Sequence, residues 1–243
     1  MKKFPKLLII ETASICNLKC VMCPQTAEDF GRPRIFLQDE YINSLIPYVK
    51  EARDIQLHGI GEPLISKGFW ELLKYVHPDA WCAVNSNFHK ITEKQMRVLL
   101  ESNLKHLCIS LDSPNPYTYY KIRGAKLAEV VSNIKKIVHI QKTEYPESKL
   151  IIGVNMTLME ENYNQLLDMV DLTEEMGLKE FSTWPMNEWG DAEAGVHDRN
   201  IRGWNFDYYT QLPIHFKEQY NERIDEAIDY SKEKNIKFEY IKL

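Results

Sequence analysis

The sequence predicts an α/β protein in which parallel strands alternate with helices. Short apolar runs rich in β-branched residues recur along the chain, and segments with helical spacing lie between them. The length of 243 residues suits one such unit, and 44% hydrophobic with 27% charged residues is typical of a globular protein. Six or seven strand–helix units in a row imply right-handed crossovers and either a doubly wound sheet or a full or partial barrel.

The individual elements follow from these runs in chain order. The apolar runs predict strands at residues 6–10, 54–58, 81–84, 106–111, 150–156 and 179–184, and a last short strand at 237–241. The clearest helical patterns cover residues 127–141, 163–176 and 216–234. Gly177 follows the second of these helices, where a C-terminal cap glycine is expected.

Composition excludes several classes of protein. The formal net charge is -5, and lysine and arginine are spread along the chain, so nothing indicates a nucleic-acid partner. The apolar run at residues 7–10 stops at Glu11 and is too short for a signal peptide or a membrane span. We therefore expect a cytoplasmic protein with no membrane association.

Three cysteines give the strongest chemical signal. Cys16, Cys20 and Cys23 lie within eight residues, directly after the first expected strand, at the edge where parallel α/β folds bind ligands. Three thiolates on a cubane of four irons leave one iron open to another ligand. A structural zinc site would need a fourth ligand, commonly from a second pair that is missing here, and three unrelated core cysteines are the remaining alternative. The spacing therefore favours a [4Fe-4S] cluster, whereas an odd cysteine count without a secretory signal disfavours disulfides.

Two motifs together carry a family resemblance. The pattern CxxxCxMC resembles the CxxxCxφC signature of the radical S-adenosylmethionine (SAM) superfamily, with Met22 at the usually aromatic position φ. Residues 59–63 resemble that family's GGEP element, with Ile60 in place of its first glycine. The resemblance implies that the backbone around Gly59, Gly61, Glu62 and Pro63 binds the amino group of SAM. Alone, this stretch would be an ordinary turn.

Further motifs extend the resemblance along the chain. Residues 110–113 with Arg123 and Gly124 resemble the SLD...RG pattern of the SPASM and twitch enzymes, in which the serine and arginine commonly contact the SAM carboxylate. The alternative is a strand end with an aspartate helix cap. Asn87 follows Ser86 at the family's Thr-Asn-Gly position, with Phe88 replacing glycine, and residues 153–156 match the strand packed against adenine. The resemblance thus implies cofactor contacts from a wider set of residues: Asn87, Ser110, Asp112, Arg123, Asn155 and Met156.

The resemblance covers residues 6–184 and implies a partial (β/α)6 TIM barrel with SAM and substrate at the carboxyl ends of its strands. We expect the barrel over residues 1–184, with residues 185–243 adding a substrate-side loop, a helix and a strand to the same domain. The family activity it implies is one-electron cleavage of SAM to methionine and a 5'-deoxyadenosyl radical, which abstracts hydrogen from the substrate. The electron would come from a flavodoxin or ferredoxin.

The remaining residues narrow the reaction. The SPASM and twitch enzymes carry further cysteines after the barrel, which bind auxiliary clusters. Here no cysteine follows Cys108, so the residues after it hold no cysteine ligands for such a cluster. This favours simple hydrogen abstraction, unless a longer protein supplies the missing ligands. The reaction type, an epimerase, dehydrogenase, lyase or related enzyme, stays open. Cys82 and Cys108 are typical of small buried core residues, although Cys108 could instead donate a hydrogen atom to a product radical.

The long segment of residues 185–213 has no clear periodicity and follows the sixth strand. Its aromatic and hydrogen-bonding residues, including Glu188, Arg199 and Arg202, suit a small polar metabolite such as a sugar or cyclitol, or a peptide. Glu188 is the candidate substrate ligand or base. A solvated loop packed on the barrel rim is an equally open reading. The competing function is a non-catalytic iron-sulfur carrier or sensor. Such a protein would have no obvious use for the motif at residues 61–63 or for Arg123.

Overall fold

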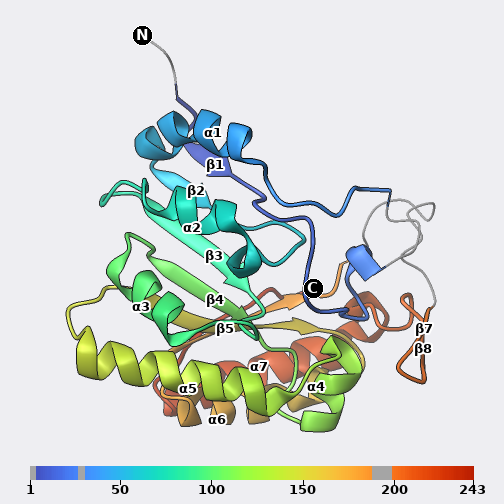
Figure 1. Cartoon of the computed structure of the whole chain (residues 1–243). Helices are drawn as coiled ribbons and strands as arrows, with labels where there is room; N and C mark the ends of the chain where they lie inside the picture. The colour runs from blue at the N-terminus through green and yellow to red at the C-terminus, as the bar shows by residue number, and fades with distance from the viewer. Residues whose placement is uncertain (1–3, 27–30, 188–198) are drawn as a thin grey trace. The chain divides into compact units, whose positions relative to one another are not determined.

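The computed structural model describes residues 4–26, 31–187 and 199–243 (Figure 1). These residues divide into two compact units whose segments interleave along the chain. Unit 1 comprises residues 1–17, 32–109 and 133–152, and unit 2 comprises residues 18–31, 110–132 and 153–243. This division does not test the boundary expected after residue 184, which stays a prediction.

Unit 1 is built on parallel strands that pair in chain order. Strands β1 (Leu7–Ile9), β2 (Asp54–Gln56), β3 (Trp81–Ser86) and β4 (His106–Ser110) are neighbours in that sequence (Figure 1). The helices between them are α1 (Asp39–Glu51), α2 (Lys67–Leu73) and α3 (Glu93–Glu101), and α1 packs against α2. A 3-10 helix, η2 (Pro63–Ile65), follows β2.

The core of unit 1 explains why these short strands form. Ile55, Cys82, Val84 and Leu107 are fully buried, so the central strands present apolar side chains at alternate positions. A capping box begins α3: the Thr92 hydroxyl accepts from the N–H of Gln95, and the Gln95 side chain accepts from the N–H of Thr92. Local sequence and burial therefore agree in this unit.

Unit 2 carries a second set of parallel strands and one hairpin. Strands β5 (Ile151–Leu158), β6 (Glu180–Pro185) and β9 (Lys237–Glu239) pair in parallel. Strands β7 (Arg199–Ile201) and β8 (Trp204–Phe206) form an antiparallel hairpin. The helices are α4 (Pro116–Arg123), α5 (Leu127–Glu144), which continues into unit 1, α6 (Leu166–Glu175) and α7 (Lys217–Glu233). Short 3-10 helices complete it: η1 (Pro24–Thr26), η3 (Tyr163–Gln165) and η5 (Pro213–Phe216).

The elements predicted from periodicity are confirmed. Every expected strand has a counterpart that begins within one residue of its predicted start, and the three clearest helices correspond to α5, α6 and α7. Gly177 follows α6 with a φ of 78°, as its predicted capping role requires. The hairpin β7–β8 was missed. Among the residues described, no helix combines the length and apolar character needed to cross a membrane.

Candidate functional site

In unit 1, the turn that follows β2 lies directly against the chain leading to the first cysteine. A Cβ on Gly61 would lie 2.2 Å from the carbonyl oxygen of Ala13 and 2.6 Å from that of Ile15. A Cβ on Gly59 would lie 2.4 Å from Cγ of Glu11. Because backbone atoms occupy the space beside Gly61, no side chain fits there without moving the chain. The glycines therefore bring two backbones together immediately before Cys16.

The carboxylate of Glu62 holds this turn to the end of β3. It is 4% exposed and accepts hydrogen bonds from the hydroxyl of Ser86 at 2.7 Å and the backbone N–H of Asn87 at 2.7 Å. A third bond comes from the N–H of Leu64 at 3.0 Å, and Pro63, also buried, begins η2 beside it. Three donors stabilise the buried charge, so Glu62 fixes the backbone of the turn.

Asn87 connects the end of β3 to the first cysteine. Its side-chain nitrogen lies 2.9 Å from Oδ1 of Asn17 and 3.6 Å from Sγ of Cys16. Phe88, which replaces the family's glycine, adopts a φ of 55° in the left-handed region and is 1% exposed. The side chain of Asn133 donates to the Phe88 carbonyl at 3.0 Å. The backbone thus keeps a conformation that favours glycine, stabilised by burial and this hydrogen bond.

In unit 2, the loop carrying the other two cysteines is bonded to the end of α4. The N–H of Val21 donates to the carbonyl of Ile122 at 2.8 Å. The Thr26 hydroxyl donates to the carbonyls of Cys23 at 2.7 Å and Cys20 at 3.1 Å, closing the loop. Apolar side chains pack around it in one buried cluster: Cys20, Val21, Met22, Ile122, Met159, Met186, Phe206, Tyr208 and Leu212.

Arg123 joins this loop to a buried carboxylate. Its Nε lies 2.5 Å from Oδ2 of Asp112, and its Nη1 lies 3.6 Å from Sγ of Cys20. Asp112 is fully buried and also accepts from the N–H of Thr157 at 2.8 Å. The side chain of Asn162 donates to the Asp112 backbone carbonyl at 2.8 Å. A chain of contacts therefore runs from β5 through Asp112 and Arg123 to a thiol.

Burial and charge act in opposite directions at this thiol. Burial raises the pKa of Cys20, while the neighbouring Arg123 guanidinium lowers it in part. Burial alone would lower the pKa of Arg123, but the negative groups beside it, Asp112 foremost, raise it overall, so the guanidinium stays charged. Arg123 therefore offsets part of the cost that burial imposes on a Cys20 thiolate.

Ser110 ends β4, and Asp112 follows it two residues later. Ser110 is half-buried. The alternative that Asp112 caps the following helix is wrong, because the cap of α4 is Asn115. Its Oδ1 accepts from the N–H groups of Tyr117 at 2.9 Å and Thr118 at 3.1 Å. Asp112 is left to pair with Arg123.

Strands β5 and β6 place polar and aromatic groups on one face. Asn155 is opposite Ser182, and Thr157 is opposite Trp184, so these four side chains share a face. The Asn155 side chain donates to the Ser182 hydroxyl at 3.0 Å, and Trp184 is 49% exposed. Met156 points to the opposite face and is fully buried. Any contact of Met156 with a ligand would therefore come from its backbone.

The donor set fits an iron-sulfur cluster. All three cysteines of the motif are free of disulfides, and a charged arginine lies beside one of them. Within the described ranges, no three His, Cys, Asp or Glu side chains form a ready-made ion site. Ligation by Cys16, Cys20 and Cys23 therefore stays a prediction that rests on the chemistry of the thiols.

Comparison with known proteins decides the family. The model of the radical SAM superfamily matches residues 10–173. The chain belongs to the radical SAM superfamily. Members of this superfamily use a [4Fe-4S] cluster and SAM, so both predicted cofactors are confirmed for the family of this chain. A radical SAM enzyme also needs an electron donor.

Relatives of this radical SAM chain differ in function. It is 26% identical over 165 residues to a probable GTP 3',8-cyclase of Methanococcus vannielii, covering 67% of this chain and 52% of that protein. It is 29% identical over 172 residues to a tungsten-containing aldehyde ferredoxin oxidoreductase cofactor-modifying protein of Pyrococcus furiosus, covering 68% and 47%. The chain thus spans about half the length of the curated relatives it matches.

Solved structures show the fold of the radical SAM chain. Streptococcus suis SuiB bound to S-adenosylmethionine matches with a TM-score of 0.71 and 18% identity, covering 98% of this chain and 51% of SuiB. SuiB bound to its precursor peptide SuiA matches with a TM-score of 0.68, 17% identity and coverage of 98% and 49%. The predicted α/β partial barrel is therefore confirmed.

The structure describes one of the two catalytic candidates, Cys108. Cys108 is 7% exposed within β4, and Cys82 is fully buried, as expected of core residues. Burial raises the pKa of the Cys82 thiol to about 12, so it stays protonated at neutral pH. Glu188 lies outside the described residues. The proposed roles of Cys108 and Glu188 stay predictions.

Sequence reasoning missed Glu11 altogether and missed the backbone contacts of Arg199 and Arg202. Glu11 accepts from the N–H of Ile60 at 2.7 Å and pairs with Arg32, which holds the start of the glycine turn. Arg199 and Arg202, which the sequence associated with substrate, bond to the chain around Cys20 and Cys23. The missed signal was the turn glycine after Arg202, which is typical of a tight hairpin.

Proposed function

We propose that Cys16, Cys20 and Cys23 hold the [4Fe-4S] cluster of a hydrogen-abstracting enzyme. When bound, cluster and SAM together supply a one-electron cleavage that yields methionine and a 5'-deoxyadenosyl radical. The observation that carries the proposal is the close approach of Gly61 to the backbone just before Cys16. The absence of a side chain lets the turn pack tightly beside a predicted cluster ligand, and this fixes the backbone groups that are proposed to bind SAM, which a simple electron carrier does not need.

The residues around the cysteines have separate roles in this proposal. Gly59 and Gly61 expose backbone groups to the SAM amino group, and Glu62 with Pro63 fixes their conformation. Arg123 has five N–H donors, and its contacts with Asp112 and Cys20 leave others to bind a carboxylate of SAM. The remaining cofactor contacts proposed are Asn87, Ser110, Asp112, Asn155 and Met156, with Asp112 acting through Arg123.

We propose a polar organic substrate, either a small metabolite such as a sugar or a peptide segment. The support is the shared face of β5 and β6, where the exposed ring of Trp184 neighbours amide and hydroxyl groups. Aromatic planes beside a few polar groups suit such ligands. Glu188 is the carboxylate proposed to bind substrate or act as a base, and Cys108 is the proposed hydrogen donor for an epimerase-like outcome. A flavodoxin or ferredoxin is the proposed electron donor.

Product analysis tests the proposal directly. Protein reconstituted anaerobically should contain about four iron and four sulfide per chain and should release 5'-deoxyadenosine when SAM and dithionite are added. Cys20→Ala should abolish both results, whereas Cys82→Ala, a matched loss of a buried cysteine outside the motif, should keep them. Full cluster loading without 5'-deoxyadenosine would contradict the proposal.

Two measurements separate the competing readings. In a non-catalytic carrier, SAM would leave the EPR signal of the reduced cluster unchanged, whereas an open iron predicts a changed signal on addition of SAM. Deuterated peptide or sugar substrates should transfer deuterium to 5'-deoxyadenosine. The class that transfers deuterium identifies the substrate.

A further inference from the structure

The hairpin β7–β8 in unit 2 has Arg202 in its turn. Its two turn residues, Arg202 with a φ of 55° and Gly203 with a φ of 76°, both adopt the left-handed region, as a tight two-residue hairpin requires. Glycine adopts this conformation freely, but arginine does so at a cost of about 1–2 kcal/mol. A charged residue in this strained position needs compensating contacts.

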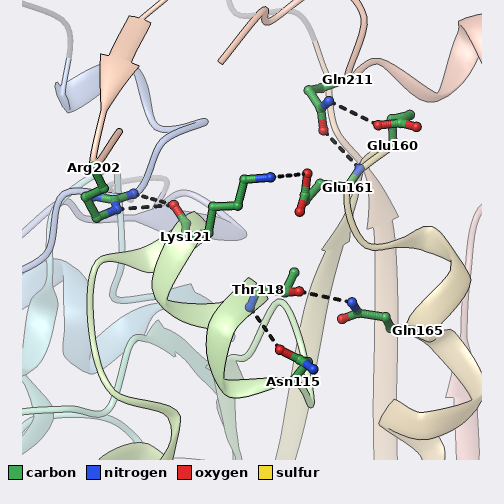
Figure 2. A network of polar contacts seen from close by, with 8 residues as sticks. All are labelled: Asn115, Thr118, Lys121, Glu160, Glu161, Gln165, Arg202 and Gln211. Carbon is green, nitrogen blue, oxygen red and sulfur yellow. Dashed lines mark hydrogen bonds and ion pairs between the residues drawn. The ribbon is translucent and has the colours of Figure 1, made fainter. Parts of the chain in front are cut away.

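Arg202 makes those contacts with backbone carbonyls. Its Nη2 donates to the carbonyls of Lys121 at 2.8 Å and Ile122 at 3.0 Å, and its Nε donates to Lys121 at 3.2 Å (Figure 2). Its Nη1 donates to the carbonyl of Lys19 at 2.8 Å. One guanidinium thus bridges the C-terminal end of α4, where carbonyls are unpaired, and the residue before Cys20.

The second arginine of the hairpin binds the other end of the cysteine loop. Nη1 of Arg199 donates to the carbonyl of Cys23 at 3.0 Å and contacts the hydroxyl of Thr26. The Thr26 hydroxyl also donates to the Cys20 carbonyl. Arg199 and Arg202 therefore bind the backbone on both sides of the Cys20–Cys23 segment.

Packing fixes the hairpin in this place. Phe206 belongs to the buried cluster that contains Cys20, and the ring of Trp204 meets it edge to face with centroids 4.9 Å apart. Nζ of Lys121 lies 4.0 Å from the centroid of Trp204 and 2.6 Å from Oε2 of Glu161 (Figure 2). The hairpin is therefore held by α4 and by the apolar cluster as well as by its own arginines.

We propose that the β7–β8 hairpin is the positioning element of the iron-sulfur loop, with Arg202 and Arg199 fixing the backbone that presents Cys20 and Cys23. The inference rests on the proposed ligation of the cluster by these cysteines. Arg202 is a positioning residue, because it acts through the Lys19 and Lys121 carbonyls. Its planar fork bonds several carbonyls at once, which the single ammonium of lysine cannot match.

The test compares Arg202→Met with Arg202→Lys and with Arg223→Met. Arg223 pairs with Glu226 on the surface of α7 in the same unit and is the matched control. Two readouts are used: the rate of cluster loss to an iron chelator in reconstituted protein, and the rate of Cys20 and Cys23 alkylation in cluster-free protein. Far-UV circular dichroism checks that each variant folds.

Loss of an outer contact to a metal site weakens metal binding about 10- to 100-fold, so Arg202→Met should lose its cluster faster by about this factor. Alkylation of Cys20 should also accelerate. Arg202→Lys should fall between Arg202→Met and wild type, and Arg223→Met should match wild type. If Arg202→Met does not fold, Arg202→Lys and Arg199→Gln provide the same test. The first weakens the contact with the Lys19 carbonyl, and the second weakens the contact with the Cys23 carbonyl.

Unchanged rates in Arg202→Met, or equal acceleration in Arg223→Met, would overturn the inference. A wild-type rate in Arg202→Lys would overturn the role of the fork. If wild-type protein holds no cluster, the proposed function fails, and the alkylation rates in cluster-free protein still decide whether the hairpin holds the loop. The two proposals therefore fail separately.

Discussion

The predicted site residues of the two units, called here the glycine half in unit 1 and the charged half in unit 2, are held by different physical means. In unit 1, the turn at residues 59–63 is shaped by missing side chains and by one carboxylate that accepts three neutral donors. In unit 2, the loop of Cys20 and Cys23 is surrounded by the cationic side chains of Arg123, Arg199 and Arg202. The first arrangement packs backbone against backbone, whereas the second places positive charge around thiols that must bind as anions.

The largest expected effect breaks the charged half. Arg123→Met leaves the fully buried Asp112 carboxylate without its cation, and removal of one partner of a buried pair costs about 3–5 kcal/mol. Urea unfolding of cluster-free protein measures this loss. The double variant with Asp112→Asn should recover part of it, because no uncompensated charge remains. A loss below about 1 kcal/mol in the single variant would show that the pair is not buried as described.

The next effect breaks the glycine half. In Gly61→Ala the new Cβ meets backbone oxygens at 2.2 and 2.6 Å, so the chain itself must move, and we expect a loss of about 3 kcal/mol. Gly203→Ala is the control, because its Cβ would have nothing within 4 Å and only the positive φ opposes it. That change should cost about 1 kcal/mol. Equal losses in thermal unfolding would rule out the close approach at Gly61.

A smaller effect tests the carboxylate that fixes the turn. Glu62→Gln keeps the shape but replaces one acceptor oxygen by an amide that faces donors, at a cost of about 2 kcal/mol. The apparent affinity for SAM should also fall, because the turn loses its fixed backbone. Glu71→Gln, which affects an exposed pair with Lys74, should leave both stability and SAM binding unchanged. Isothermal titration with SAM measures the difference.

The smallest effect is expected for Lys121, a partly exposed cation in unit 2. Lys121 pairs with Glu161 and lies over Trp204, and its side chain is 20% exposed. Lys121→Met should cost at most about 1 kcal/mol, because partly exposed ion pairs and cation–π contacts are weak. Lys232→Met, from a highly exposed pair with Asp229, is the control and should be neutral. A loss above that of Arg123→Met would invert the proposed order.

Much of the fold was predictable because its longer strands carry buried apolar residues at regular positions. The run that became β5 places buried apolar residues at alternate positions, such as Ile152, Val154 and Met156, so its pattern indicates a strand. The hairpin β7–β8 carries no such pattern, since its strands have three residues each and include Arg199 and Asn200. Its stability comes from contacts with distant segments, which local periodicity does not contain.

The candidate site was predictable residue by residue but not in its connections. The motifs indicated Glu62 and Arg123 as ligand-binding groups, yet their nearest partners are the chain itself: Asn87 for one and Asp112 for the other. These pairs join residues 25 and 11 positions apart, and no spacing rule predicts them. Phe88 is the opposite case, because its positive φ preserves the backbone of the glycine that the motif led us to expect.

The Arg202 guanidinium lies where a side chain at position 124 would lie. A Cβ on Gly124, which has a φ of 73°, would lie 2.7 Å from Nη1 of Arg202. The guanidinium thus occupies the volume that any other residue at position 124 would fill, and each position restricts the choice at the other. Substitutions at the two sites should therefore be strongly non-additive, with Gly124→Ala harming the wild type more than it harms Arg202→Ala. A side chain at position 124 would therefore displace the guanidinium from the carbonyls that it binds.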